Sequence, residues 1–348
     1  MPDLSMRPDL DQLRHQAKDL LRAAKAGDAA AVTRIRAVSD QLILASAQLA
    51  LAREYGFPSW ARLKTEVDRR RIFDRGDVAA LRGLLAEHPE LASVRMEHWC
   101  DHRMGADPLG YLAMLRFDTG RLGLPPDLPG VGAMTQALID AGAPVEGSPG
   151  ASETPLMTAA SYGDAEVARV LIDAGARMDA TASLSAGGVP GGTALAHAAF
   201  FGMPHVVDVL AAAGSPIRNL AEAAAAGDLA GFLDPPTTEA ERVAALRLAA
   251  GHERLDVIDA LLAAGTPVDG VDEDGSTALH EAAYYGRPAS VRHLLARGAD
   301  PNLRDTNYGG APLGWCRHEH ENVGASPRHD EVEAILEPLT TPDDGSEK

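Results

Sequence analysis

Several groups of histidine, cysteine and carboxylate residues in the sequence have the composition of zinc sites. His280-Glu281-Ala282-Ala283-Tyr284 is close to the zinc-binding helix motif His-Glu-x-x-His, but its fifth residue is Tyr. Residues 98–102 (HWCDH) and 316–320 (CRHEH) each supply one Cys and two His, which are ligands that zinc prefers. Each group is one ligand short of a closed structural site, and neither has CxxC-type spacing. We therefore expect no metal and no cofactor.

Nucleophilic catalysis has little support in the sequence. The chain contains no Gly-x-Ser-x-Gly elbow, and no complete glycine-rich phosphate loop follows a strand pattern. Cys100 has His98 and His102 nearby, but side chains adjacent in sequence rarely form a working dyad. Cys316 is expected to be a small buried residue. We therefore assign no catalytic residue from these patterns.

The helices that would position these residues are encoded by a pattern that repeats along the chain. Gly followed by a small residue, a pattern that ends helices, occurs at residues 142, 175, 214, 265 and 298, with spacings of 33, 39, 51 and 33. The two longer spacings exceed 33 by 6 and 18 residues. The extra residues fall near 182–192 and 232–240, where Gly, Ser and Pro predict loops. The sequence is therefore built on a 33-residue unit with insertions.

Each unit has the pattern of two short helices. Thr154-Pro155-Leu156 predicts a helix start, because Thr is a good N-cap and Pro fits the first helical position. Gly163 predicts the end of that helix, and residues 167–172 carry the apolar stripe of a second one. The pattern recurs from residues 193 and 277, and in weaker form from 311. Neither helix of a pair can bury its apolar face alone, so the pairs must stack into an all-α solenoid.

The clearest unit is residues 274–302, which contain DGSTALHEAAYYG followed by LLARGADPN. This unit resembles the ankyrin repeat, and the resemblance covers roughly residues 71–338. It implies an ankyrin-repeat solenoid of stacked helix pairs with short β-turn fingers, in which His280 links the fingers through hydrogen bonds.

The chain departs from the ankyrin pattern in three places. The unit that begins at Asp107 is split by a Pro/Gly-rich insertion near 116–133. Residues 218–236 and 243–265 are expected to form helix pairs with a shortened finger. Glu253 stands where the family has Gly, which predicts a strained turn or a longer helix.

The resemblance also implies where a partner binds. In ankyrin repeats the two residues before the Gly that closes the first helix face a concave groove and usually contact partners. Five of the 15 aromatic residues fall at such positions here, which favours a binding surface, because aromatic anchors dominate many interfaces. Positions three residues earlier are expected to border the same groove. The expected partner-binding residues are Tyr111, Tyr162, His197, Phe200, Phe201, His252, Glu281, Tyr284, Tyr285, Trp315 and His318.

Residues 1–70 lack the repeat. Leucines between residues 10 and 21 predict an amphipathic helix, and further helices are expected at 42–51 and 61–67. The segment is similar to the small helical cap that precedes ankyrin arrays in some bacterial proteins. Residues 1–75 carry 14 basic and 10 acidic side chains, a net charge of +4, so a docking module is the alternative. We therefore expect a cap at 1–70, the array at 71–338 and a disordered acidic tail at 339–348.

Charge limits the classes of partner. Residues 76–348 carry 18 basic and 40 acidic side chains, a net charge of −22. This argues against nucleic acid and favours a neutral or basic partner. The sequence has two cysteines, lacks a signal-peptide pattern and lacks an apolar run of about 20 residues, so we expect a monomeric cytoplasmic protein that does not bind membranes.

Two functions from different classes remain open. The first is a non-enzymatic recognition scaffold whose groove binds a protein segment or a small ligand, with a concavity at Ala225-Ala226 between the two aromatic pairs. The alternative is an enzyme of natural-product metabolism, of cyclase or hydrolase type. Its acid–base groups would be His197, His252, Glu281 and Tyr284, and these would have to converge on one bound substrate.

Overall fold

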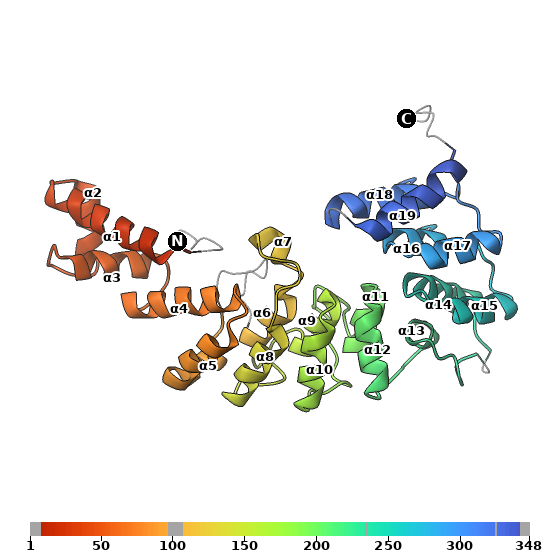
Figure 1. Ribbon diagram of the computed structural model, residues 1–348, viewed down its shortest axis with the longest axis horizontal. Coiled ribbons are helices and arrows are strands. Elements are labelled where there is room, and N and C mark those ends of the chain that lie inside the picture. Colours follow the sequence, from red (N-terminus) through yellow and green to blue (C-terminus); the bar gives the residue numbers. More distant parts are fainter. Residues whose placement is uncertain (1–7, 97–106, 234–235, 324–325, 342–348) are drawn as a thin grey trace. The chain divides into compact units, whose positions relative to one another are not determined.

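The computed structural model describes residues 8–96, 107–233, 236–323 and 326–341 (Figure 1). Across these ranges every regular element is a helix, which confirms the predicted all-α fold class. The chain divides into two compact units. One comprises residues 1–151 and 169–176, and the other comprises residues 152–168 and 177–348. The helix α10 (Ala165–Asp173) crosses this division.

The N-terminal unit begins with a helical bundle and continues with helices of the repeat type. Its elements are α1 (Leu10–Lys25), α2 (Ala29–Arg36), α3 (Leu44–Glu54), α4 (Trp60–Phe73), α5 (Val78–Glu87), η1 (Pro89–Ala92), α6 (Pro108–Leu115), α7 (Thr119–Leu122) and α8 (Val131–Asp140). Helices α1, α2 and α3 pack against one another, α4 contacts α3 and α5, and α8 packs on α5 and α6.

Local signals account for most of these helices. Asp9, Asp28 and Ser59 cap α1, α2 and α4, each by accepting a hydrogen bond from a backbone N–H in the first turn. Helix α2 is absent from the helices expected from the sequence, because its eight residues are too few to show a clear apolar stripe. Helix α4 runs through residue 70 without a break, so the boundary predicted between cap and array falls inside a helix.

Arg69 fixes α4 to the segment that follows α5. Its side chain is fully buried, and Nη1 donates to the carbonyl oxygens of Leu91 and Val94, both at 2.9 Å. Nη2 lies 2.7 Å from the carboxylate of Glu66, which is also buried. The buried guanidinium thus gives the two carbonyl oxygens and the Glu66 carboxylate the polar partner that water would otherwise supply.

The split unit after residue 107 follows the prediction. Asp107 caps α6 by accepting from the backbone N–H of Gly110 at 2.9 Å. Residues 116–130 separate α6 from its partner α8, and they contain only the single-turn helix α7. The insertion therefore leaves the packing of the helix pair intact.

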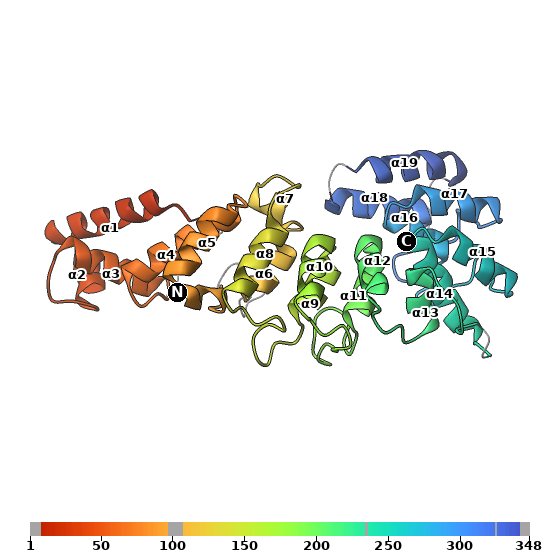
Figure 2. The ribbon, with the colours of Figure 1, turned by 60° about the horizontal axis from the view of Figure 1, so that its bottom comes forward.

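The C-terminal unit is a stack of short helices. Its elements are α9 (Pro155–Tyr162), α11 (Ala194–Phe200), α12 (Pro204–Ala212), α13 (Leu220–Ala226), α14 (Glu239–Gly251), α15 (Leu255–Ala263), α16 (Ala278–Tyr284), α17 (Pro288–Ala296), α18 (Pro312–Val323), α19 (Pro327–Leu336) and η2 (Glu337–Leu339). First helices α9, α11, α13, α14, α16 and α18 pack in this order. Among the second helices, α17 lies between α15 and α19 and packs against both (Figure 2).

One predicted helix pair is wrong. In the described residues 218–233 and 236, α13 is followed by no second helix, because the chain after Gly227 continues as turns. Leu229, Phe232 and Leu233 nevertheless pack against the core that α13, α14 and α16 share. These apolar residues produced the helical pattern, but here they cover the core from irregular backbone.

The predicted strain at residue 253 is confirmed. Glu253 has a φ of 55°, and it is the one non-glycine residue with positive φ among those the structure describes. The helix before it, α14, is also long, at 13 residues. The Glu253 carboxylate pairs with Arg328 and accepts from the backbone N–H of Ala289 in the first turn of α17 at 3.2 Å. The side chain thus contributes contacts that a glycine could not make.

The fingers connect neighbouring repeats. Thr306 donates its backbone N–H to the carbonyl of Asp274 in the preceding finger at 2.8 Å. His280 Nε2 lies 3.1 Å from the carbonyl oxygen of Gly310, and Nδ1 faces the Thr277 hydroxyl at 2.9 Å. The role expected for His280 is confirmed, and the residue is a structural donor.

Candidate functional site

Two aromatic pairs that lie 85 residues apart in sequence meet in the C-terminal unit. The Tyr285 hydroxyl donates to the carbonyl oxygen of Phe200 at 2.7 Å. The rings of Phe200 and Phe201 form an edge-to-face pair with centroids 5.0 Å apart, as do those of Tyr284 and Tyr285. The space predicted to be open at Ala225-Ala226 is therefore bridged by Tyr285.

Glycines make this contact possible. A Cβ atom at Gly202 would lie 2.6 Å from the Tyr285 ring, and one at Gly251 would lie 3.2 Å from it. Arg287 fixes the same place by donating to the carbonyl oxygens of Gly202 at 2.6 Å and Gly251 at 2.7 Å. Its guanidinium carbon lies 6.0 Å from the Tyr285 ring centroid. The C-terminal ends of α11, α14 and α16 therefore converge around one tyrosine.

The aromatic contacts continue to α18. The Trp315 ring lies 5.9 Å from that of Tyr284, and its Nε1–H donates to the buried carboxylate of Asp305 at 3.0 Å. Burial and the nearby Glu319 carboxylate raise the pKa of Tyr284 to about 12. We call Phe200, Phe201, Tyr284, Tyr285 and Trp315 the aromatic surface. Phe200 is 57% exposed and the other four are half-buried.

Four other predicted site residues are buried and have contacts inside the protein. Tyr111 is 2% exposed and stacks on Phe73. His197 is fully buried with Nδ1 2.9 Å from the Ser161 hydroxyl, and His252 is 2% exposed with Nε2 2.8 Å from the carbonyl oxygen of Ala199. Burial lowers the pKa of both histidines, that of His252 to about 4. These side chains hold helices together and do not face a partner.

Glu281, the fourth, belongs to a small ion cluster. Arg247 on α14 donates to Glu281 at 2.8 Å and also pairs with Asp272 in the finger before α16. Burial raises the pKa of Glu281, while Arg247 lowers it. His197 and His252 are hydrogen-bonded to other protein groups and the Tyr284 ring packs against Trp315, so each of the four acid–base candidates has a contact inside the protein.

The remaining two expected residues are accessible. Tyr162 ends α9 and is half-buried, and His318 on α18 is exposed. Tyr162 lies next to Ser161, the residue bonded to His197. Glu319, the neighbour of His318, is not among the site residues expected from the sequence, because its proximity to Tyr284 on another helix leaves no local signal.

The Cys/His group on α18 is dispersed. The Cys316 thiol is buried and donates to the carbonyl of His329 at 3.5 Å, and burial raises its pKa to about 11. His320 stacks on the His329 ring and lies 3.5 Å from Asp330. No three His, Cys, Asp or Glu side chains in the described ranges are grouped to hold a metal ion. Residues 98–102 lie outside those ranges.

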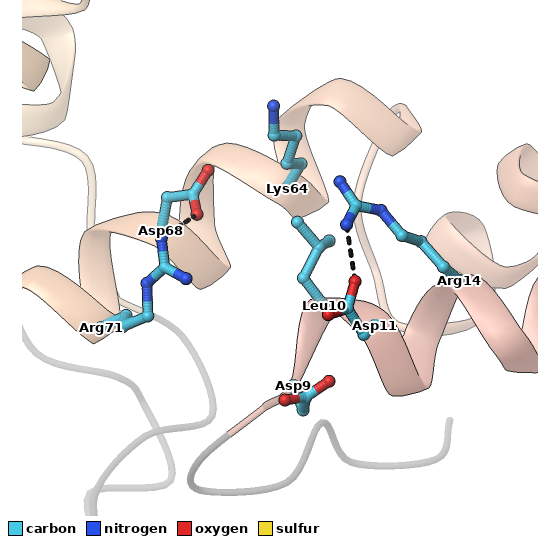
Figure 3. Close-up of a pocket in the computed structure, with 7 residues that line it drawn as sticks. All are labelled: Asp9, Leu10, Asp11, Arg14, Lys64, Asp68 and Arg71. Atoms are coloured by element: carbon cyan, nitrogen blue, oxygen red, sulfur yellow. Dashed lines mark hydrogen bonds and ion pairs between the residues drawn. The ribbon is translucent and has the colours of Figure 1, made fainter.

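The helical bundle contains a separate polar pocket of about 340 Å³ between α1 and α4 (Figure 3). Arg14 pairs with Asp11 at 2.7 Å, and Arg71 lies 3.4 Å from Asp68. Lys64 and Asp9 complete the charged lining. Three acids and three bases balance one another, so the pocket does not concentrate the +4 charge that suggested a docking module.

Comparison with known families assigns the repeats. A family model described as "Ankyrin repeats (3 copies)" matches residues 131–220 and again 220–305, together half of the chain. The chain belongs to the ankyrin repeat family. Ankyrin repeats generally mediate protein–protein interaction. The crystal structure of the human ASB11 ankyrin repeat domain is similar at 20% identity and a TM-score of 0.39, covering 78% of this chain and 97% of that one.

Assignment to ankyrin repeats confirms the fold predicted from the 33-residue period. In the described ranges no helix is both long enough and apolar enough to span a lipid bilayer.

Proposed function

We propose that this ankyrin protein is a non-enzymatic scaffold that binds a protein segment, neutral or basic in charge, on the aromatic surface of its C-terminal unit. The observation that carries the proposal is Phe200, whose ring is 57% exposed on a fixed backbone. Carbonyls at 199, 200 and 202 accept hydrogen bonds from His252, Tyr285 and Arg287. An apolar ring held rigidly in water loses little conformational entropy when a partner covers it.

The composition of the surface agrees with this role. Tyr and Trp are enriched among the residues that dominate binding energies, since they bury a large area and keep a polar group available. The net charge of −22 on residues 76–348 disfavours acidic partners. The enzyme alternative gains no support, because its four acid–base side chains contact separate groups: His197 contacts Ser161, His252 contacts Ala199, Glu281 contacts Arg247 and Tyr284 contacts Trp315.

The test uses the full chain and a displayed library of 12-residue peptides. Peptides selected on the wild-type protein are synthesised, and their dissociation constants are measured by fluorescence polarisation. We expect F200A and Y284A each to weaken binding by at least about tenfold, the effect of removing an interface anchor. F117A serves as the control, because Phe117 is 62% exposed outside the aromatic surface.

Circular dichroism shows whether each variant keeps its helix content. Selected peptides that bind F200A and Y284A as tightly as the wild type would place the binding site elsewhere and would reject the proposal.

A further inference from the structure

The aromatic surface ends in a corner formed by Tyr284, Trp315 and Glu319. The Tyr284 ring makes an angle of 76° with Trp315 and of 83° with Tyr285, so the three rings face different directions. Trp315 is fixed by its hydrogen bond to Asp305, and Glu319 follows it by one turn on α18, close enough to Tyr284 to raise the pKa of that hydroxyl. The corner therefore combines fixed aromatic rings with a carboxylate.

Glu319 is the uncompensated charge of this corner. In the described parts of the chain it forms no salt bridge, and the hydrogen bond it accepts comes from the Asn322 side-chain amide at 3.5 Å. Glu281 and Asp272, by contrast, share Arg247. Arg287 is committed to two backbone carbonyls. A ligand group that covers the corner must therefore face an unpaired carboxylate.

We propose that the corner binds one cationic side chain, Arg or Lys, of the partner segment, an inference that rests on the proposed function. A cation gains attraction from the ring faces and from Glu319 at the same time. A purely apolar anchor would desolvate Glu319 without pairing it, which is costly. The protein already uses this chemistry next to the corner, where the Arg287 guanidinium lies over the Tyr285 ring.

The experiment uses the full chain and the peptides selected for the test above. Each Arg or Lys in a binding peptide is replaced in turn by citrulline or norleucine, which keep length but remove charge. We expect one position at which the replacement weakens binding roughly 5- to 30-fold, the range of a partly desolvated cation–π contact. E319Q should weaken the parent peptide and should not weaken the neutral peptide, whose anchor no longer desolvates an unpaired charge.

Matched variants separate the roles of ring and carboxylate. E321Q makes the same charge change at an exposed position of α18 and should leave binding unchanged. Y284F keeps the ring and removes only the hydroxyl beside Glu319, so it should cost less than Y284L.

The two proposals fail in different ways. Binding that depends on Phe200 and Tyr284 but is insensitive to every neutral replacement and to E319Q would overturn the cation site and leave the proposed function standing. Binding insensitive to F200A and Y284A would overturn both.

Discussion

The buried imidazole of His252 makes a prediction about acid stability. His252 ends α14, and its Nε2–H donates to the carbonyl of Ala199 on α11. Nδ1 is buried without a hydrogen-bond partner in the described structure, so a proton added there would be poorly solvated. Burial accordingly lowers the pKa of His252 from 6.5 to about 4. The folded protein therefore favours the neutral form of the His252 imidazole.

The magnitude follows from the difference between the two states. Below pH 6.5 the unfolded chain takes up a proton at this residue that the folded chain excludes until about pH 4. Stability is therefore fully present above pH 6.5 and is lost as the pH falls towards 4. Linkage gives a loss of about 2 kcal/mol at pH 5, rising to about 3 kcal/mol below pH 4.

Urea unfolding followed by circular dichroism tests this at pH 7 and pH 5. H252Q keeps an N–H donor but does not titrate. The wild type should lose about 2 kcal/mol more than H252Q between the two pH values. H205Q, at an exposed position of α12, should behave as the wild type. Equal losses in wild type and H252Q would refute the reasoning, as would a His252 Cε1 proton resonance that titrates near pH 6.5.

Two further predictions concern single side chains. E253A should lower the free energy of unfolding by about 1–2 kcal/mol, since it removes the contacts to Arg328 and Ala289 and keeps the positive φ. E253G should cost less in the same urea assay, because glycine tolerates that backbone. R69A should cost about 3 kcal/mol or more by thermal or urea unfolding, because it leaves buried carbonyls and Glu66 unpaired. R71A, at a side chain 62% exposed, should stay within about 0.5 kcal/mol; equal effects would contradict burial as the cause.

Features encoded within a few residues were predictable from the sequence. Thr154, Thr193 and Thr277 each cap the helix that the repeat pattern placed after them. Gly163 adopts the left-handed conformation expected of a helix stop, and the departure at Glu253 correctly indicated strain. In these cases residues close in sequence determine the backbone conformation, so the sequence of a single repeat is sufficient to predict it.

Contacts between repeats were not predictable in the same way. The positions of Phe200 and Tyr285 in the repeat predicted that both face a groove. They did not indicate that the Tyr285 hydroxyl would bond to the backbone carbonyl of Phe200. Likewise, His252 and Glu281 occupy groove positions in the repeat register, and the structure buries both. Exposure depends on how closely the neighbouring helices approach, which is a property of several repeats together.

The incomplete repeat that contains α13 offers a physical reason why these neighbouring helices lie so close together. A regular repeat contributes a second helix, but the described residues between α13 and α14, 228–233 and 236–238, form none. Arg254, at the start of α15, donates to the carbonyl of Ala225 and pairs with Asp208 on α12, so one side chain connects elements on both sides of the missing helix. The first helices remain stacked through α13, while His252, Tyr285 and Arg287 reach the end of α11. Carbonyls at a helix end need donors, and these three supply them. The loss of a second helix would thus favour convergence of the first-helix ends, and this convergence fixes Phe200 at the aromatic surface.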